Sequence, residues 1–163
     1  MIILKIYVTL VVTIIENMSA STKLSTAVKA LCYLSKSYPK PRSSTQISMK
    51  TGANASKLRQ LLSMLGKQEI VTSIKGTTGG FLINKDPGEI NLQEIYCAIE
   101  DRKAFHLDVS KAETQRVSEI AAFDDYFFDL FAEVQVGIEA KMEKITLQDI
   151  MDKVGIKSFF NQK

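Results

Sequence analysis

The sequence has little of the chemistry that metal centres and hydrolytic active sites need. Its 163 residues include two cysteines, Cys32 and Cys97, too few for a disulfide scaffold or a four-thiolate zinc site. The one histidine, His106, excludes a histidine-rich metal site, and no nucleophile motif lies near it to form a Ser-His-Asp arrangement. No set of residues points to an enzyme, and we expect neither a metal nor another cofactor.

Acidic residues are almost absent from one part of the chain. Residues 22–85 contain eleven lysines and arginines and one acid, Glu69, for a net charge of +10. Residues 86–163 carry nine basic and sixteen acidic side chains, for a net charge of −7. A short basic run is usually only a solvated surface, but a basic block as long as a domain attracts phosphate backbones. The charge division therefore predicts a nucleic-acid-binding domain in residues 22–85.

The sequence also lacks an apolar run long enough for a membrane helix. Residues 1–15 are mostly apolar, but a bilayer span needs about 20 such residues. A secretory signal would need a positive start and a small-residue cleavage site, which residues 19–21 resemble only weakly. We favour Met18 as the true start, with residues 1–17 an upstream reading or an added segment, because the residues from Ser21 onward read as a complete cytoplasmic domain without membrane contact. If the segment is present in the mature protein, we expect residues 1–20 to form an apolar extension outside the core.

Helical periodicity predicts three helices in the basic block. Apolar residues recur at helical spacing over residues 22–36, and a capping box of Ser43 and Gln46 begins a second helix that Gly52 ends. Asn54 caps a third helix, in which four leucines share one face. The opposite face is polar and basic. Its residues are Ser56, Lys57, Arg59, Gln60, Ser63 and Lys67.

Two short strands follow the third helix. Residues 70–74 and 81–83 are rich in β-branched and aromatic residues, and the glycine-rich stretch 75–80 between them forms a hairpin tip. Three helices followed by a hairpin are typical of a winged helix-turn-helix, in which the third helix enters the major groove of DNA. We therefore expect a mainly α-helical protein with a small β-hairpin wing, its DNA-binding domain spanning residues 21–100.

The acidic part of the chain predicts a linker over residues 101–120 and then a dimerisation helix and tail over 121–163. Residues 121–145 form a helix about 37 Å long at 1.5 Å per residue, longer than a winged domain is wide. Its apolar stripe could pack on its own domain, but its length favours a second copy as partner. The stripe is spaced almost as a heptad repeat. The predicted interface residues are Phe127, Phe131, Val134, Ile138 and Met142.

Several motifs resemble the Rrf2 (Rrf-two) family of bacterial winged-helix transcription regulators. They are TKLSTAVKALCYL in the first helix, SSTQISMKTGANASKLRQLLSMLGKQEIV in the helix-turn-helix, and SIKGTTGGFLINKDPGEINLQEI in the wing and beyond. The resemblance covers residues 22 to about 154. It implies a DNA-binding repressor that acts as a homodimer on a two-fold symmetric operator. The operator, the regulated genes and the effector do not follow from it.

The resemblance also implies which residues contact DNA. They are Asn54, Ser56, Lys57, Arg59 and Gln60 in the third helix and Lys75 at the wing. Lys75 stands where family members commonly have arginine, so its contact should select less for the width of the minor groove. Arg59 stands where an acid is often found, so the operator of the family does not transfer.

The number and positions of the cysteines lead to two further expectations. The branch of the family that binds an iron–sulfur cluster has three cysteines between the fourth helix and the long helix, whereas residues 101–120 contain none. We therefore expect the cluster-free branch. Cys32 and Cys97 are either small packed residues or a thiol-based redox switch. A winged-helix module for protein–protein assembly is the alternative function, against which the basic face of the third helix argues.

Overall fold

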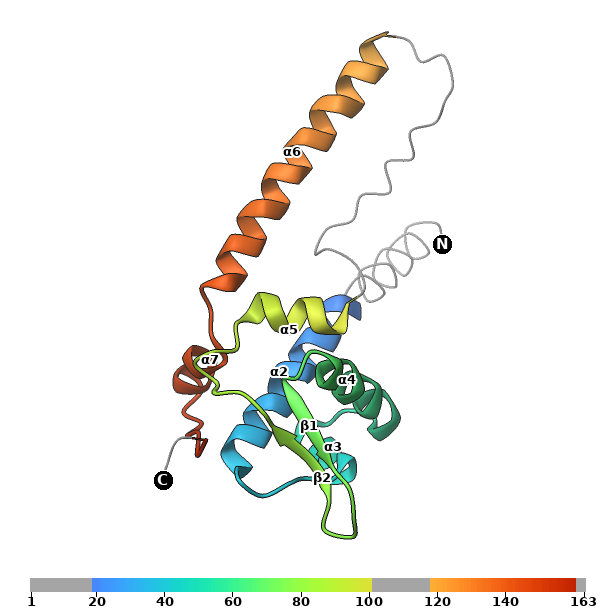
Figure 1. The fold of residues 1–163 in the computed structure, drawn as a ribbon. Coiled ribbons are helices and arrows are strands. Elements are labelled where there is room, and N and C mark those ends of the chain that lie inside the picture. Colours follow the sequence, from blue (N-terminus) through green and yellow to red (C-terminus); the bar gives the residue numbers. More distant parts are fainter. Residues whose placement is uncertain (1–18, 101–117, 161–163) are drawn as a thin grey trace, which may run out of the picture.

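A computed structural model describes residues 19–100 and 118–160 of the chain. In these ranges, five helices and a two-stranded sheet form a head from which a sixth, long helix projects (Figure 1). The expectations for residues 1–17 and for His106 lie outside the described residues. The helices are α2 (Ser19–Ser37), α3 (Ser44–Thr51), α4 (Ala55–Lys67), α5 (Leu92–Ile99), α6 (Ser118–Glu143) and α7 (Leu147–Lys153), and the strands are β1 (Val71–Ile74) and β2 (Gly80–Ile83).

The predicted caps fix where the short helices begin. The Ser43 hydroxyl accepts a hydrogen bond from the Gln46 amide at 3.2 Å, and the Gln46 side chain accepts one from the Ser43 amide at 3.0 Å. Gly52 then ends α3 in the left-handed conformation, with φ 72°. Thr146 and Asp149 form the same kind of capping box at the start of α7. The box at Ser43 confirms the predicted start of α3, and the box at Thr146 fixes the start of α7.

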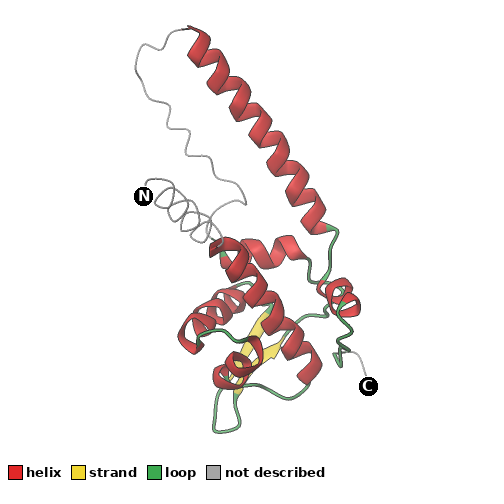
Figure 2. Cartoon of the chain, turned by 180° about the vertical axis from the view of Figure 1, so that it is seen from behind, coloured by secondary structure: helices red, strands yellow, loops and turns green. Residues whose placement is uncertain are grey.

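The core of the head forms around α2. Leu31 and Leu34 on this helix are fully buried, as are Ile47 on α3 and Leu58 on α4. In Figure 2 the sheet and the other helices of the head lie around α2. The remaining large side chains that are fully buried are Leu62, Leu65, Ile70, Ile83, Ile90, Ile95, Ile99 and Leu147.

The wing is joined to the rest of the head by a third extended segment. Strands β1 and β2 pair antiparallel, with Val71 opposite Ile83 and Ile74 opposite Gly80. On the other edge of β2, the Arg42 amide donates to the Phe81 carbonyl at 2.9 Å, and the Phe81 amide donates back to Arg42 at 2.8 Å. The segment between α2 and α3 therefore holds the base of the wing.

The long helix differs in its bounds from the prediction. It begins at Ser118, so the last residues of the predicted 101–120 linker are helical, and it ends at Glu143 rather than near Ile145. The chain then turns, and Leu92 and Leu147 each donate a backbone hydrogen bond of 2.8 Å between the start of α5 and the start of α7. None of the described helices is long and apolar enough to cross a bilayer.

The C-terminal tail is docked on the head. The Phe159 amide donates to the Ser35 carbonyl at 3.1 Å, and the ring of Phe160 lies 4.6 Å from that of Tyr38. In the structure the tail continues the packing of α7 along the C-terminal half of α2.

We expect Gly80→Ala to weaken the attachment of the wing. A Cβ at Gly80 would lie 2.5 Å from the carbonyl carbon and oxygen of Arg42, and the φ of 153° is unfavourable for alanine. Because backbone atoms cannot move aside cheaply, the free energy of unfolding should fall by about 1–3 kcal/mol. Chemical denaturation measures this change. Gly66→Ala is the matched control, since its Cβ would meet Val71 at an ordinary 3.7 Å. Equal stability of the two variants would contradict the prediction.

Candidate nucleic-acid interface

Helix α4 separates an apolar face from a polar one as predicted. Leu58, Leu61, Leu62 and Leu65 are buried against the rest of the head. The six residues of the polar face, from Ser56 to Lys67, are all exposed. Because the leucines hold the helix against the head, its polar face is presented to solvent in a fixed orientation. The structure thus brings Ser56, Lys57, Arg59 and Gln60 together on one surface.

Asn54 belongs to this surface but already has a structural role. Its side-chain oxygen accepts hydrogen bonds from the amides of Ser56 at 2.9 Å and Lys57 at 3.3 Å, which makes it the N-cap of α4. An asparagine whose oxygen is engaged still has two N–H donors on its amide nitrogen. Asn54 can therefore cap the helix and donate to a phosphate or a base acceptor at the same time.

The wing presents the second part of the surface. Lys75 follows β1 directly and is exposed, as are Gly76, Thr77 and Thr78 at the tip. The Gly79 amide donates to the Gly76 carbonyl at 3.0 Å and closes the turn. The tip extends from the end of the head opposite to α6 (Figure 1). It is small and polar, so its contacts to a partner would come from Lys75, the threonine hydroxyls and the backbone.

The charges of this surface are not neutralised within the described chain. Its two ion pairs are Lys23–Glu100, at 3.1 Å, and Lys85–Glu94, at 2.6 Å, and both join the basic block to α5. Among residues 19–100 and 118–160, no carboxylate lies within 4.0 Å of the amino or guanidinium groups of Lys57, Arg59 or Lys75. The positive potential of α4 and the wing is therefore available to an anionic partner.

Arg42 is a residue of this region that the sequence did not single out. Its guanidinium lies 5.9 Å from the centre of the Tyr33 ring, while its backbone pairs with Phe81 of the wing. Arg42 therefore positions the wing relative to α2. Its place directly after Pro41 gives no sign of this role, because the pairing depends on a strand distant in sequence.

The cysteines lie on separate helices. Cys32 in α2 is 4 % exposed, and burial raises the pKa of its thiol to about 11. Cys97 in α5 is exposed, and its pKa is raised first by partial burial and then by Glu139 and Glu143 of α6. Raised pKa values favour the thiol over the reactive thiolate. They support packing as the role of Cys32, while an oxidant response through either cysteine stays a prediction.

The donors of the described chain do not fit an iron–sulfur cluster. Such clusters need about three or four cysteine or histidine ligands at one place. No group of three or more metal-ligating side chains occurs among residues 19–100 and 118–160. The two cysteines of the sequence lie in α2 and α5, one buried and the other exposed.

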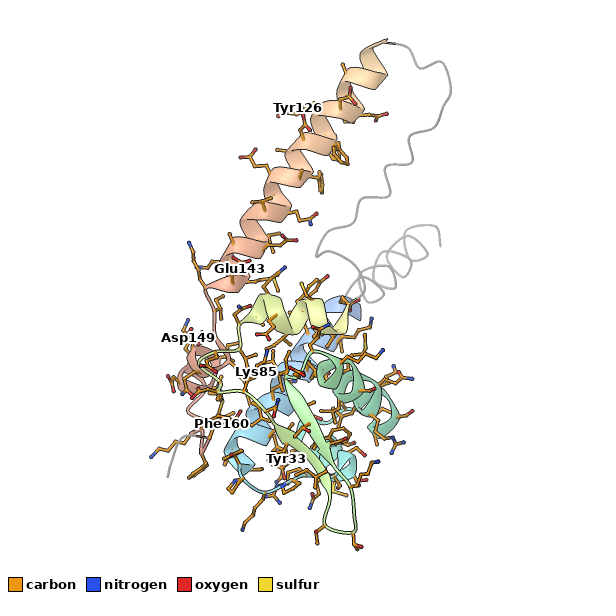
Figure 3. All side chains as sticks on the ribbon, in the orientation of Figure 1. Tyr33, Lys85, Tyr126, Glu143, Asp149 and Phe160 are labelled. Atoms are coloured by element: carbon orange, nitrogen blue, oxygen red, sulfur yellow. The ribbon has the colours of Figure 1, made fainter. Side chains whose placement is uncertain are left out.

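The predicted interface residues lie along the projecting helix α6. Phe127 and Val134 are 37 % and 44 % exposed, and Phe131, Ile138 and Met142 are partly buried. The Phe127 ring lies 4.7 Å from that of Phe131. Figure 3 shows side chains standing out from α6 along its whole length, with Tyr126 near its free end. The helix thus carries an apolar stripe that the described chain leaves largely uncovered.

The raised pKa of Cys32 predicts a loss of stability at alkaline pH. The unfolded thiol ionises near its ordinary pKa of 9.0, but the folded thiol stays protonated until about pH 11. Stability from this group is therefore complete below pH 9 and declines above it, by about 1.4 kcal/mol at pH 10. The difference in unfolding free energy between the wild type and Cys32→Ala should shift by this amount from pH 7 to pH 10. The prediction would be refuted if the unfolding free energies of the wild type and Cys32→Ala changed in parallel with pH. Cys97→Ala, at an exposed site, should show a smaller shift.

Comparisons with known proteins agree with this architecture. The chain is 37 % identical over 76 residues to the transcriptional regulator IscR of Cronobacter sakazakii, an alignment that spans 47 % of this chain and 46 % of that protein. The chain thus matches less than half the length of this curated relative. The structure superposes on IscR of T. potens with a TM-score of 0.61 at 24 % identity, covering 82 % of this chain and 85 % of that one.

A second solved structure supports the same fold. CymR of B. subtilis, described as a global cysteine regulator, gives a TM-score of 0.62 at 21 % identity and covers 81 % of this chain and 95 % of that one. Both likenesses confirm the winged-helix fold with its long helix. The model of the Rrf2 family, described as iron-dependent transcriptional regulators, matches residues 20–153. The chain therefore belongs to the Rrf2 family of transcriptional regulators.

Proposed function

We propose that this chain is a sequence-specific DNA-binding repressor that acts as a homodimer on a two-fold symmetric operator without an iron–sulfur cluster. The observation that carries the proposal is the exposed, uncompensated polar and basic face of α4 beside the wing. Winged-helix proteins place this helix in the major groove, where arginine and glutamine side chains read base edges. Lys75 on the wing would then contact the neighbouring phosphate backbone of the DNA.

Each part of the interface has a separate task. The leucines of α4 set the orientation of the helix, and the positive end of the helix dipole at its N-terminus favours a nearby phosphate. Arg59 and Gln60 lie one turn or more beyond that end, and their planar guanidinium and amide groups can form two hydrogen bonds with one base. Base readout is therefore assigned to Arg59 and Gln60, and backbone anchoring to Lys57 and Lys75.

Homodimerisation rests on the apolar stripe of α6. At 26 residues the helix is about 39 Å long, and its far half extends beyond the head (Figure 1). Exposed apolar patches of this kind mark interaction sites. A second copy would cover the stripe with an identical one and would also give the two DNA-binding surfaces that a two-fold symmetric operator needs.

The proposal that the repressor lacks an iron–sulfur cluster rests on the number and positions of its cysteines. Residues 101–120 contain no cysteine, and the two cysteines elsewhere lie on different helices.

We expect Arg59→Ala and Gln60→Ala each to lower sequence discrimination by about 1–3 kcal/mol, because each removes hydrogen bonds to base edges. Fluorescence anisotropy would compare an operator, selected from random duplexes with the wild-type protein, with a scrambled duplex of the same composition. An equal loss of affinity for both duplexes would show that these residues clamp phosphates and do not read sequence.

Lys75→Ala is the matched comparison for Arg59→Ala and Gln60→Ala. A residue that contacts phosphate contributes to all sequences, so this variant should weaken binding to both duplexes and reduce the slope of log affinity against log salt by about one unit. An unchanged slope would exclude a phosphate contact by Lys75.

We expect Ile138→Glu to prevent dimerisation. The substitution would place an unpaired carboxylate in the apolar interface. Burying this charge costs more free energy than leaving it exposed at the surface of the protein. Sedimentation velocity should show monomers, with circular dichroism to verify folding. Val136→Glu is the matched control, because at 3.6 residues per turn Val136 lies on the acidic side of α6 with Asp125 and Asp129 and is 65 % exposed. A dimer with Ile138→Glu, or monomers with both variants, would overturn the assigned interface.

A further inference from the structure

A concave groove lies between α2 and α7, on the side of α2 away from α4. Helices α4 and α7 lie on opposite sides of α2 in both views of the chain (Figures 1 and 2). The groove has a volume of about 600 Å³. Its apolar lining comes from Leu24, Val28 and Cys32 of α2, from Leu92 of α5, from Ile150 of α7 with Val154 at its C-cap, and from Ile156 in the tail.

Part of this apolar lining is open to solvent. Val154 is 60 % exposed, and Leu24, Val28 and Ile150 are partly exposed, whereas Cys32 at the bottom is 4 % exposed. A groove of this volume is in the range of small-molecule sites, which are mainly apolar with a few polar groups that fix orientation. The shape and lining therefore suit the hydrocarbon part of a small ligand.

The charged groups at the groove are all of one sign. Lys29 and Lys36 of α2 and Lys50 of α3 contribute to its lining, and no aspartate or glutamate does. Lys29 and Lys36 are seven residues apart, so they lie on the same side of α2 about two turns from each other. Within the described ranges, none of these lysines has a carboxylate within 4.0 Å. The rim is therefore complementary to an anionic group.

We propose that this groove binds a small anionic amphiphile, with its carboxylate or phosphate at the lysines and its apolar chain along Val28, Cys32 and Val154. DNA does not fit this chemistry, because an apolar floor offers nothing to a phosphate backbone. The occupant is a free molecule rather than a membrane surface, since the apolar atoms lie in a concave site between two helices. The proposal does not depend on the proposed DNA binding.

The test is isothermal titration calorimetry of the full chain with decanoate below its micelle concentration. We expect saturable binding of one decanoate per chain and at least tenfold weaker binding of decyltrimethylammonium, which has the same chain length and the opposite charge. Equal binding of the two, no saturable binding of decanoate, or binding only to vesicles of anionic lipid would overturn the proposal.

Two variants locate the site. Lys29→Gln with Lys36→Gln should weaken decanoate binding at least tenfold, and both positions are exposed, so folding should be retained. Ser25→Trp, at an exposed residue of the lining, should fill the groove and abolish binding. Lys40→Gln changes an exposed lysine that is not part of the lining and serves as the control. Wild-type affinity in the double lysine variant, or equal losses with Lys40→Gln, would refute the assigned site.

Discussion

The burial of one face of α2 is the constraint on which the rest of the structure depends. Leu31 and Leu34 are inaccessible to solvent, and α3, α4, α5, α7 and β2 all contact the helix that carries them. Burying a leucine side chain contributes about 1.5–3 kcal/mol. Because the other helices of the head and β2 all pack on this one helix, α2 sets the position of α4, the wing and the docked tail relative to one another.

In this arrangement, the residues that hold α4 in place differ from the residues that its polar face offers to a partner. The interior near α4 consists of leucine and isoleucine, and the groups that interact with a partner lie outside it on the same helix. The start of α4 is fixed by Asn54 and the wing base by Arg42, so neither depends on bound DNA for its local geometry. Preorganisation of this kind lowers the conformational entropy lost on binding.

Much of the fold could be predicted from the sequence because its signals are local. The capping box of Ser43, the cap of Asn54 and the leucines of α4 act within a few residues, and the structure confirms all three. The sequence does not predict the first turn of α6, from Ser118, because the residues before Ala121 carry no steady apolar period. The pairing of Arg42 with the wing and the groove between α2 and α7 could not be predicted, since both join segments distant in sequence.

The short backbone bridge between Asn91 and Thr146 gives α6 a mechanical property. It fastens the base of α6 to the start of α5, and α5 also packs against α4. The helix is then a lever with its pivot at the head. A tilt of about 10° at this pivot moves the far end of a helix about 39 Å long by about 7 Å, twice the 3.4 Å rise of one base pair. In the proposed homodimer, two such helices packed along their apolar stripes would convert a small tilt at either base into a change of register between two DNA half-sites.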